Sequence, residues 1–249
     1  MTSSEFAKPG GCPQDSSVSM NAVVPQSIII PVSGGLRVSG LLQVPPEARV
    51  CYVLAHGAGA GMTHPFMSAV ADGLAGRRIA TLRYQFPYME RGAKRPEAPE
   101  LAHATVRAAV IEASHRLPEL ALFAGGKSFG GRMTSQAQAV SALPGVRGLV
   151  FLGFPLHPPG KPSNERARHL SEVKIPMLFL QGTRDEFAEL QRLEAVCQQL
   201  ERATLKLFQD ADHSFHVPVR TGRKDSEIRA ELLEAMTSWI GRIMAGGPR

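Results

Sequence analysis

Short continuous apolar runs recur along the chain from residue 50 onward. Such runs are typical of strands that are buried on both faces of a sheet. The five purest runs are residues 50–54, 79–82, 122–124, 149–152 and 177–180. A sixth run, residues 205–208, is less pure, and we therefore expect it nearer an edge of the sheet.

Helical periodicity fills most of the intervals between these runs. Apolar residues that recur every three or four positions lie on one face of a helix, which can pack against a sheet. Five segments have this spacing: residues 66–74, 106–117, 133–140, 190–200 and 228–243. Strands that alternate with amphipathic helices predict an α/β fold, with a mainly parallel central sheet and helices on both faces.

The chain before residue 50 has a different pattern. Residues 27–30 and 36–42 flank Ser33-Gly34-Gly35, which predicts an antiparallel hairpin at the edge of the sheet. Residues 1–26 are rich in Ser, Pro and Gly and are expected to form a flexible tail. Because no shift in composition marks a second domain, residues 27–249 are predicted to form a single domain.

Charge and cysteine content narrow the range of partners. The net charge is +6, yet the 28 lysines and arginines are scattered, so we expect a charged surface and no nucleic-acid partner. Cys12, Cys51 and Cys197 show no metal-binding or disulfide spacing, which favours a reducing compartment. No run approaches the roughly 18 apolar residues of a membrane span, and residues 1–26 lack the features of a signal peptide. These observations predict a cytoplasmic protein without a membrane partner.

The most informative motif is Gly126-Lys127-Ser128-Phe129-Gly130, which follows a predicted strand and opens a predicted helix. It fits the G-x-S-x-G nucleophile elbow, in which a sharp strand-to-helix turn exposes the serine hydroxyl. The flanking glycines avoid clashes in that turn. Ser128 is therefore the candidate nucleophile. A phosphate-binding P-loop would need a further glycine where the chain has Ala121.

A serine nucleophile needs an imidazole to take its proton and a carboxylate to orient that imidazole. In hydrolases with such an elbow, the acid and then the histidine follow the serine in the sequence. Asp185 lies just beyond the run at 177–180, with Glu186 as a neighbouring rival. His213 is a better candidate base than His216 because it lies nearer the end of the last strand. The pair lacks the spacing of a zinc helix, so no metal is expected.

Residues 56–59, His-Gly-Ala-Gly, follow the strand that ends at Ala55. In this architecture such a loop supplies one donor of an oxyanion hole, and the residue after the nucleophile supplies the other. We therefore assign the hole to the backbone amides of Ala58 and Phe129. The alternative is a glycine-rich turn that only begins a helix.

Less can be inferred about the substrate pocket. Pro-rich segments at residues 85–100 and 155–174 each follow a strand, and either wall the active face or form surface excursions. Aromatic side chains in and beside them are candidates for an apolar substrate site: Tyr84, Phe86, Tyr88 and Phe154. Cations near the catalytic loops either favour an acidic substrate or make structural ion pairs: Arg83, Lys127 and Arg184.

Several of these motifs together resemble a known family. They lie at residues 55–59, 84–91, 125–132, 154–162, 181–185 and 211–215. The chain resembles, from about residue 28 to its C-terminus, the α/β-hydrolase branch that contains testis-expressed protein 30 and subunit 3 of the non-specific lethal complex. This branch is related to the dienelactone hydrolases, whose nucleophile is a cysteine. Because Ser128 stands here instead, a dienelactone substrate is not expected.

The resemblance implies an α/β-hydrolase fold and a serine hydrolase of the carboxylesterase type. With the motifs, it predicts cleavage of a small ester by Ser128, His213 and Asp185 through an acyl-enzyme, without a cofactor. One alternative is a catalytically silent interaction module, because one branch of the family acts within a chromatin complex. Another is an acyltransferase or lipase with the same triad. The sequence leaves the natural substrate and the oligomeric state open.

Overall fold

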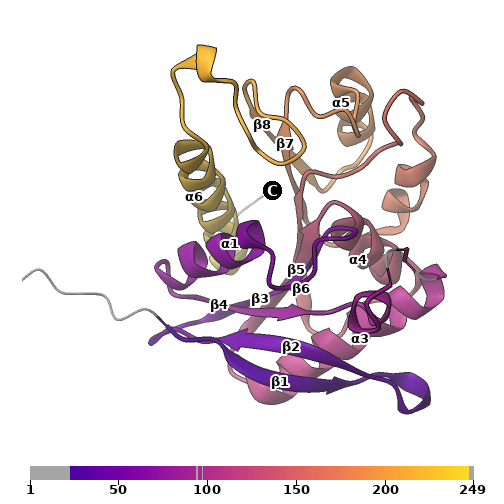
Figure 1. Ribbon diagram of the computed structural model, residues 1–249, viewed down its shortest axis with the longest axis vertical. Coiled ribbons are helices and arrows are strands. Elements are labelled where there is room, and N and C mark those ends of the chain that lie inside the picture. The colour runs from indigo at the N-terminus through magenta and orange to yellow at the C-terminus, as the bar shows by residue number, and fades with distance from the viewer. Residues whose placement is uncertain (1–22, 94, 97, 247–249) are drawn as a thin grey trace, which may run out of the picture.

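The computed structural model describes residues 23–246 except residues 94 and 97, and its centre is an eight-stranded sheet (Figure 1). The strands are β1 (Gln26–Pro31), β2 (Arg37–Gln43), β3 (Val50–Ala55), β4 (Ile79–Tyr84), β5 (Ala121–Lys127), β6 (Val146–Leu152), β7 (Met177–Gly182) and β8 (Ala203–Phe208). Their order across the sheet is β1-β2-β4-β3-β5-β6-β7-β8. The predicted runs at residues 50–208 all lie in strands, and the least pure run forms the edge strand β8.

Only the first two strands depart from parallel pairing. β1 pairs with β2, and β2 with β4, in antiparallel register, whereas every pair from β4 to β8 is parallel. A short 3₁₀ helix (Ser33–Gly35) connects β1 and β2, where Gly34 and Gly35 have positive φ values of 71° and 77°. The predicted edge hairpin and mainly parallel sheet are therefore confirmed.

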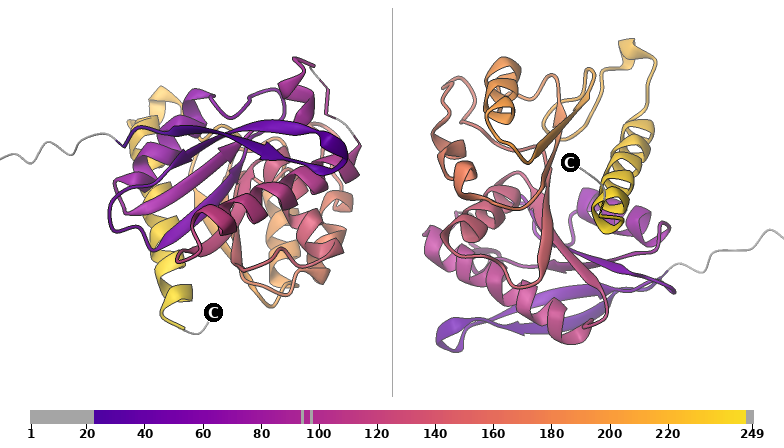
Figure 2. Two further views of the ribbon diagram at one scale, coloured as in Figure 1. Left: turned by 90° about the horizontal axis from the view of Figure 1, so that it is seen from below. Right: turned by 180° about the vertical axis from the view of Figure 1, so that it is seen from behind.

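Helices cover both faces of the sheet, as the alternating pattern predicts (Figure 2). Helices α1 (Pro65–Ala75) and α6 (Asp225–Met244) pack on one face, and α3 (Pro99–Arg116), α4 (Phe129–Val140) and α5 (Leu190–Gln198) on the other. The position of β3 between the two helical layers explains why its sequence is apolar throughout. Tyr52 faces the first helical layer and Val53 the second, and both are buried.

The irregular segments contain short helices that the periodicity did not predict. These are α2 (Pro87–Glu90) and the 3₁₀ helices at Glu165–Glu172 and Val219–Thr221. Residues 1–22 of the predicted tail, with Cys12, lie outside the described residues, while Cys51 and Cys197 are buried free thiols. Within the described part of the chain, no helix has the length and apolar character needed to span a bilayer.

The parallel strands end at one common edge of the sheet. Ala55 of β3 is in register with Gly126 of β5, and Lys127 is in register with Leu152 of β6. Gly182 of β7 is in register with Phe208 of β8. The loops that follow these strands therefore meet at this edge, which is where α/β sheets bind their ligands.

Candidate active site

Ser128 forms a sharp turn between β5 and α4. Its backbone has φ 49° and ψ −115°, a conformation that costs a non-glycine residue free energy and that clusters at functional sites. A Cβ at Gly126 would lie 2.2 Å from the Ala55 carbonyl oxygen, and one at Gly130 would lie 2.6 Å from the same atom. Both glycines are therefore required by the close approach of β3, which supports the elbow interpretation of the motif.

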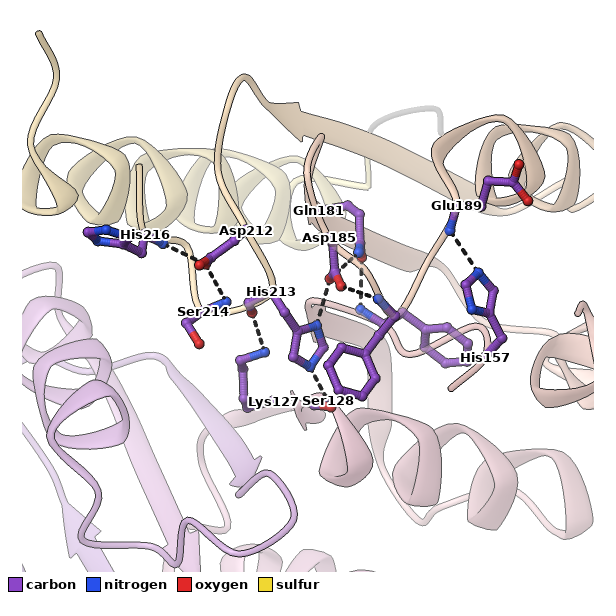
Figure 3. Close-up of polar contacts among 12 residues, drawn as sticks. Lys127, Ser128, His157, Gln181, Asp185, Glu189, Asp212, His213, Ser214 and His216 are labelled. Carbon is purple, nitrogen blue, oxygen red and sulfur yellow. Dashed lines mark hydrogen bonds and ion pairs between the residues drawn. The ribbon is translucent and has the colours of Figure 1, made fainter. Parts of the chain in front are cut away.

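The structure brings the three residues of the predicted triad together (Figure 3). His213 Nε2 lies 2.8 Å from Ser128 Oγ, and His213 Nδ1 lies 2.6 Å from Asp185 Oδ2. With Nδ1–H donating to the carboxylate, Nε2 is free to accept the serine proton. The rival His216 is exposed and pairs with Asp225 at 2.7 Å. The rival acid Glu186 is exposed to solvent.

The Asp185 carboxylate is buried and held by hydrogen bonds from the chain around it. Gln181 Nε2 donates to Oδ2 at 2.5 Å, and the Phe187 amide donates to Oδ1 at 2.8 Å. Gln181 is itself oriented, because its Oε1 accepts the Phe154 amide at 2.9 Å. The carboxylate thus faces the imidazole in one fixed orientation. Sequence reasoning missed Gln181, although a polar residue at the end of a buried strand was a usable signal.

Lys127 lies beside the histidine and influences its protonation. Its Nζ donates to the His213 carbonyl oxygen at 2.6 Å, and burial lowers the pKa of Lys127 to about 8, against the charges of Asp185 and Asp212. Burial also lowers the pKa of His213, and the charge of Lys127 adds to this effect. The hydrogen bond from Asp185 opposes it. The imidazole is therefore kept neutral, which is the form that a general base needs.

The predicted oxyanion loop is fixed from beneath. His56 donates through Nδ1 to the Gly57 carbonyl at 2.8 Å, and its Nε2 accepts the Phe86 amide at 3.1 Å. Tyr88 Oη accepts the Gly59 amide at 3.1 Å. Among the described residues, no group accepts a hydrogen bond from the amides of Ala58 or Phe129. Both residues border a cavity that reaches Ser128, as an oxyanion hole would require.

The four aromatic residues predicted to line the pocket lie instead in the core. Tyr84, Phe86, Tyr88 and Phe154 are at most 1% exposed and border neither cavity at Ser128. The reason is the direction of α2, which turns back under the oxyanion loop and places Phe86 and Tyr88 against Phe129. Phe154 packs on Phe151 and Phe179. These side chains therefore support the site from behind.

Two cavities meet at the serine. The first has a volume of about 270 Å³ and includes Gly57, Ala60, His64, Phe66, Met67, Lys127, His213 and Ser214 in its wall. The second has about 330 Å³ and includes Pro96, Pro99, Phe129, Arg132, Met133, Pro155 and Arg166. Ala58, Ser128 and Phe187 border both. Both Pro-rich segments thus contribute to the cavity walls, which is one of the two alternatives that the sequence left open.

The three cations singled out in the sequence have different positions. Lys127 borders the first cavity. Arg83 is buried, donates to the Met62 carbonyl and to Ser68 Oγ, and borders neither cavity. Arg184 is exposed and borders neither cavity. Two cavity arginines, Arg132 and Arg166, were missed. The four-residue spacing from Ser128 to Arg132 was a signal, because it places Arg132 about one helical turn after the nucleophile.

Among residues 23–246, leaving aside 94 and 97, no group of three or more His, Cys, Asp and Glu side chains is arranged to hold a metal ion. A hydroxyl, an imidazole, a buried carboxylate and two unpaired amides are the components of acyl transfer.

Comparison with known proteins is consistent with this arrangement. Residues 48–241 match the family described as alpha/beta hydrolase domain. A dienelactone hydrolase from Anabaena variabilis is 22% identical with a TM-score of 0.70, over 88% of this chain and 98% of that one. A lidless serine hydrolase from Xanthomonas campestris is 21% identical with a TM-score of 0.68, over 87% and 95%. A serine hydrolase homologue from Coxiella burnetii is 20% identical with a TM-score of 0.69, over 84% and 96%. At these identities the three structures show a shared fold.

Proposed function

The chain belongs to the alpha/beta hydrolase domain family, and from this premise we propose that it is a serine hydrolase of the carboxylesterase type that cleaves a small ester. The observation that carries the proposal is the continuous chain of contacts from Asp185 through His213 to Ser128. Solved structures of similar fold include an esterase domain from Rhodothermus marinus and an esterase from Pyrococcus furiosus. Those activities belong to the neighbours and support the reaction class proposed here.

In the proposed mechanism, His213 Nε2 takes the proton of Ser128 as Oγ attacks the ester carbonyl. Asp185 stabilises the imidazolium that forms, and the Ala58 and Phe129 amides donate to the oxyanion. His213 then protonates the leaving alcohol, which leaves an acyl-enzyme on Ser128. Water, deprotonated by the same imidazole, attacks the acyl carbon, and the collapse of the second oxyanion releases the acid and restores Ser128.

Within the family, we place the chain in the branch of testis-expressed protein 30 and subunit 3 of the non-specific lethal complex. The motifs at residues 84–91 and 154–162 support this placement. The structure gives these motifs a physical role, because they contribute Tyr88 beneath the oxyanion loop and Phe154 beside Gln181. The buried part of each motif is thus tied to the shape of the site, while residues 158–162 are exposed.

The test is covalent labelling with a fluorophosphonate, followed by mass spectrometry of the adduct. We expect labelling at Ser128 and none in Ser128→Ala. Ser135→Ala is a matched control, since Ser135 Oγ also lies close to a histidine, 2.7 Å from His169 Nε2, but its hydroxyl has no role in the proposed triad. Ester turnover should fall by several orders of magnitude in Ser128→Ala alone.

The same preparations distinguish the alternative functions. A folded wild-type protein that is not labelled would overturn the proposal in favour of a silent interaction module. Product analysis with an added alcohol acceptor distinguishes hydrolysis from acyl transfer, since a transferase would form a new ester in preference to the free acid. Esters of increasing chain length compare an esterase with a lipase, and the cavity volumes of about 270 and 330 Å³ favour short chains.

A further inference from the structure

The second cavity contains two arginines within a wall that is otherwise mainly apolar. Arg132 lies on α4, one turn after Ser128, and its amide donates to the Ser128 carbonyl at 3.1 Å. Arg166 comes from the 3₁₀ helix at Glu165–Glu172. The same cavity is bordered by Ser128, Ala58 and Phe129, which form the proposed catalytic centre. A group bound by these arginines would therefore belong to a molecule that also reaches the serine.

Neither arginine has an acidic partner among the residues that the structure describes. Arg132 Nε is buried and has no hydrogen-bond acceptor. Its guanidinium lies over the Phe129 ring, with 5.9 Å between Cζ and the ring centroid. By contrast, the nearby Arg168 is exposed and pairs with Glu165 at 2.8 Å. Both arginines thus border the second cavity without an acidic partner among the described residues, and Arg132 keeps one buried donor without an acceptor.

The second cavity brings two positive charges close together in a partly buried position. Burial lowers the pKa of both guanidinium groups, and the charge of Arg166 lowers that of Arg132 further. His169 beside them is kept neutral, since burial and then the charge of Arg132 lower its pKa to about 4. Two like charges that border one partly buried cavity repel each other, and a bound anion would offset that repulsion.

We propose that Arg132 and Arg166 bind a carboxylate of the substrate, so that the preferred esters carry a free acid group a few atoms from the scissile bond. This inference rests on the proposed function and names its substrate class. A planar carboxylate matches the planar guanidinium group and can accept two parallel hydrogen bonds from it. The small volume of about 330 Å³ fits a short chain between ester and acid. Monoesters of short dicarboxylic acids and short acyl esters of hydroxy acids are the two forms of such a substrate.

The test compares an acidic ester with its neutral counterpart. The ratio of kcat/KM for monomethyl glutarate to that for dimethyl glutarate should fall about 10- to 100-fold in Arg132→Gln, and in the same direction in Arg166→Gln. Arg168→Gln is the matched control and should keep the wild-type ratio. Equal losses on both esters would overturn the proposal, because they would indicate a structural role. Replacing the acid ester by 3-acetoxypropanoate and its methyl ester distinguishes a carboxylate on the alcohol side from one on the acyl side.

A binding measurement separates this inference from the proposed function. Glutarate should slow fluorophosphonate labelling of Ser128 in wild type and less so in Arg132→Gln, whereas dimethyl glutarate should show no such difference. Stronger protection by inorganic phosphate than by glutarate would overturn the carboxylate assignment. Suppose that Ser128 is labelled, that glutarate gives no protection, and that the arginine variants keep the wild-type ratio of kcat/KM for the acidic and neutral esters. The carboxylate inference then fails, and the proposed serine hydrolase function stands. If Ser128 is not labelled, both fail.

The melting temperature of Arg132→Gln should equal or exceed that of wild type, which shows that the variant is folded.

Discussion

Gln181 and His213 both contact Oδ2 of Asp185, at 2.5 and 2.6 Å. The amide of Gln181 therefore fixes the oxygen that orients the imidazole. Because Gln181 is held in turn by the Phe154 amide, the position of the base depends on the loop after β6 as well as on β7 and β8. The proposed triad is thus supported by a fourth side chain that does not contact the serine.

Replacement of Gln181 should affect turnover more than binding. We expect Gln181→Met to lower kcat about tenfold with a smaller change in KM, because the carboxylate loses one orienting donor. The Phe154 amide loses its acceptor as well, so unfolding should require about 1–3 kcal/mol less. Steady-state kinetics and urea unfolding measure the two effects. Gln136→Met, on α4 but outside the walls of both cavities, is the control, and an unchanged kcat in Gln181→Met would remove Gln181 from the site.

The pH at which kcat/KM falls on the acid side, the acid limb, should depend on Lys127. The charge of Lys127 is one of the causes that lower the pKa of His213, and only neutral His213 accepts the serine proton. Lys127→Met should therefore raise that pKa and move the acid limb of kcat/KM to higher pH. Lys206→Met, an exposed lysine of β8, should leave the limb in place. A limb that moves to lower pH in Lys127→Met would contradict the electrostatic argument.

The folded chain should be more stable with glycine at position 128 than with alanine. Its φ of 49° with ψ of −115° costs a residue with a Cβ about 1–3 kcal/mol, whereas glycine adopts it freely. Glycine is more flexible in the unfolded chain, which offsets about 0.5–1 kcal/mol of that gain. The free energy of unfolding should therefore be about 1 kcal/mol larger for Ser128→Gly than for Ser128→Ala. Ser128→Gly should accordingly unfold at a higher urea concentration. Both variants lack the Ser128 hydroxyl, so the comparison measures the backbone strain less the offset from the flexibility of glycine in the unfolded chain.

Acidification should destabilise the fold through His56. Burial lowers the pKa of His56 to about 4, against 6.5 for the unfolded chain, so the unfolded state binds the proton first as the pH falls. Its contribution is complete above pH 6.5 and is lost as the pH falls toward about 4. Between pH 6.5 and 5 the loss is about 2 kcal/mol. His56→Gln should lose less stability over this range than wild type, while His115→Gln, at an exposed position of α3, should lose as much as wild type.

The sheet could be predicted from the sequence because it is buried on both faces. In β3 and β6, consecutive residues face opposite helical layers and nearly all are apolar, a pattern that few other elements share. Ser128, Asp185 and His213 were identifiable because each follows a strand and the parallel strands end together. Their roles remain predictions until labelling and kinetics are performed.

The pocket could not be predicted in the same way. Phe86 and Tyr88 follow β4 closely in sequence, but the turn into α2 decides whether they face a ligand or the core, and that turn depends on contacts with Phe129. The Phe187 ring, whose centroid lies 4.3 Å from that of the His213 ring, is placed by the hydrogen bond that its backbone amide donates to Asp185 Oδ1. The contacts with Phe129 and with His213 join residues far apart in the sequence and leave no periodic signal.

The position of the histidine has a consequence for the timing of activity during folding. Ser128 and His213 are 85 residues apart, and His213 follows β8, the last strand of the described sheet. A growing or partly refolded chain that has completed β1 to β6 can hold the serine in its elbow, but it has no base to activate it. In the proposed mechanism, hydrolysis therefore begins only when β8 pairs with β7, so that the return of catalysis on refolding should report completion of the sheet rather than its initiation.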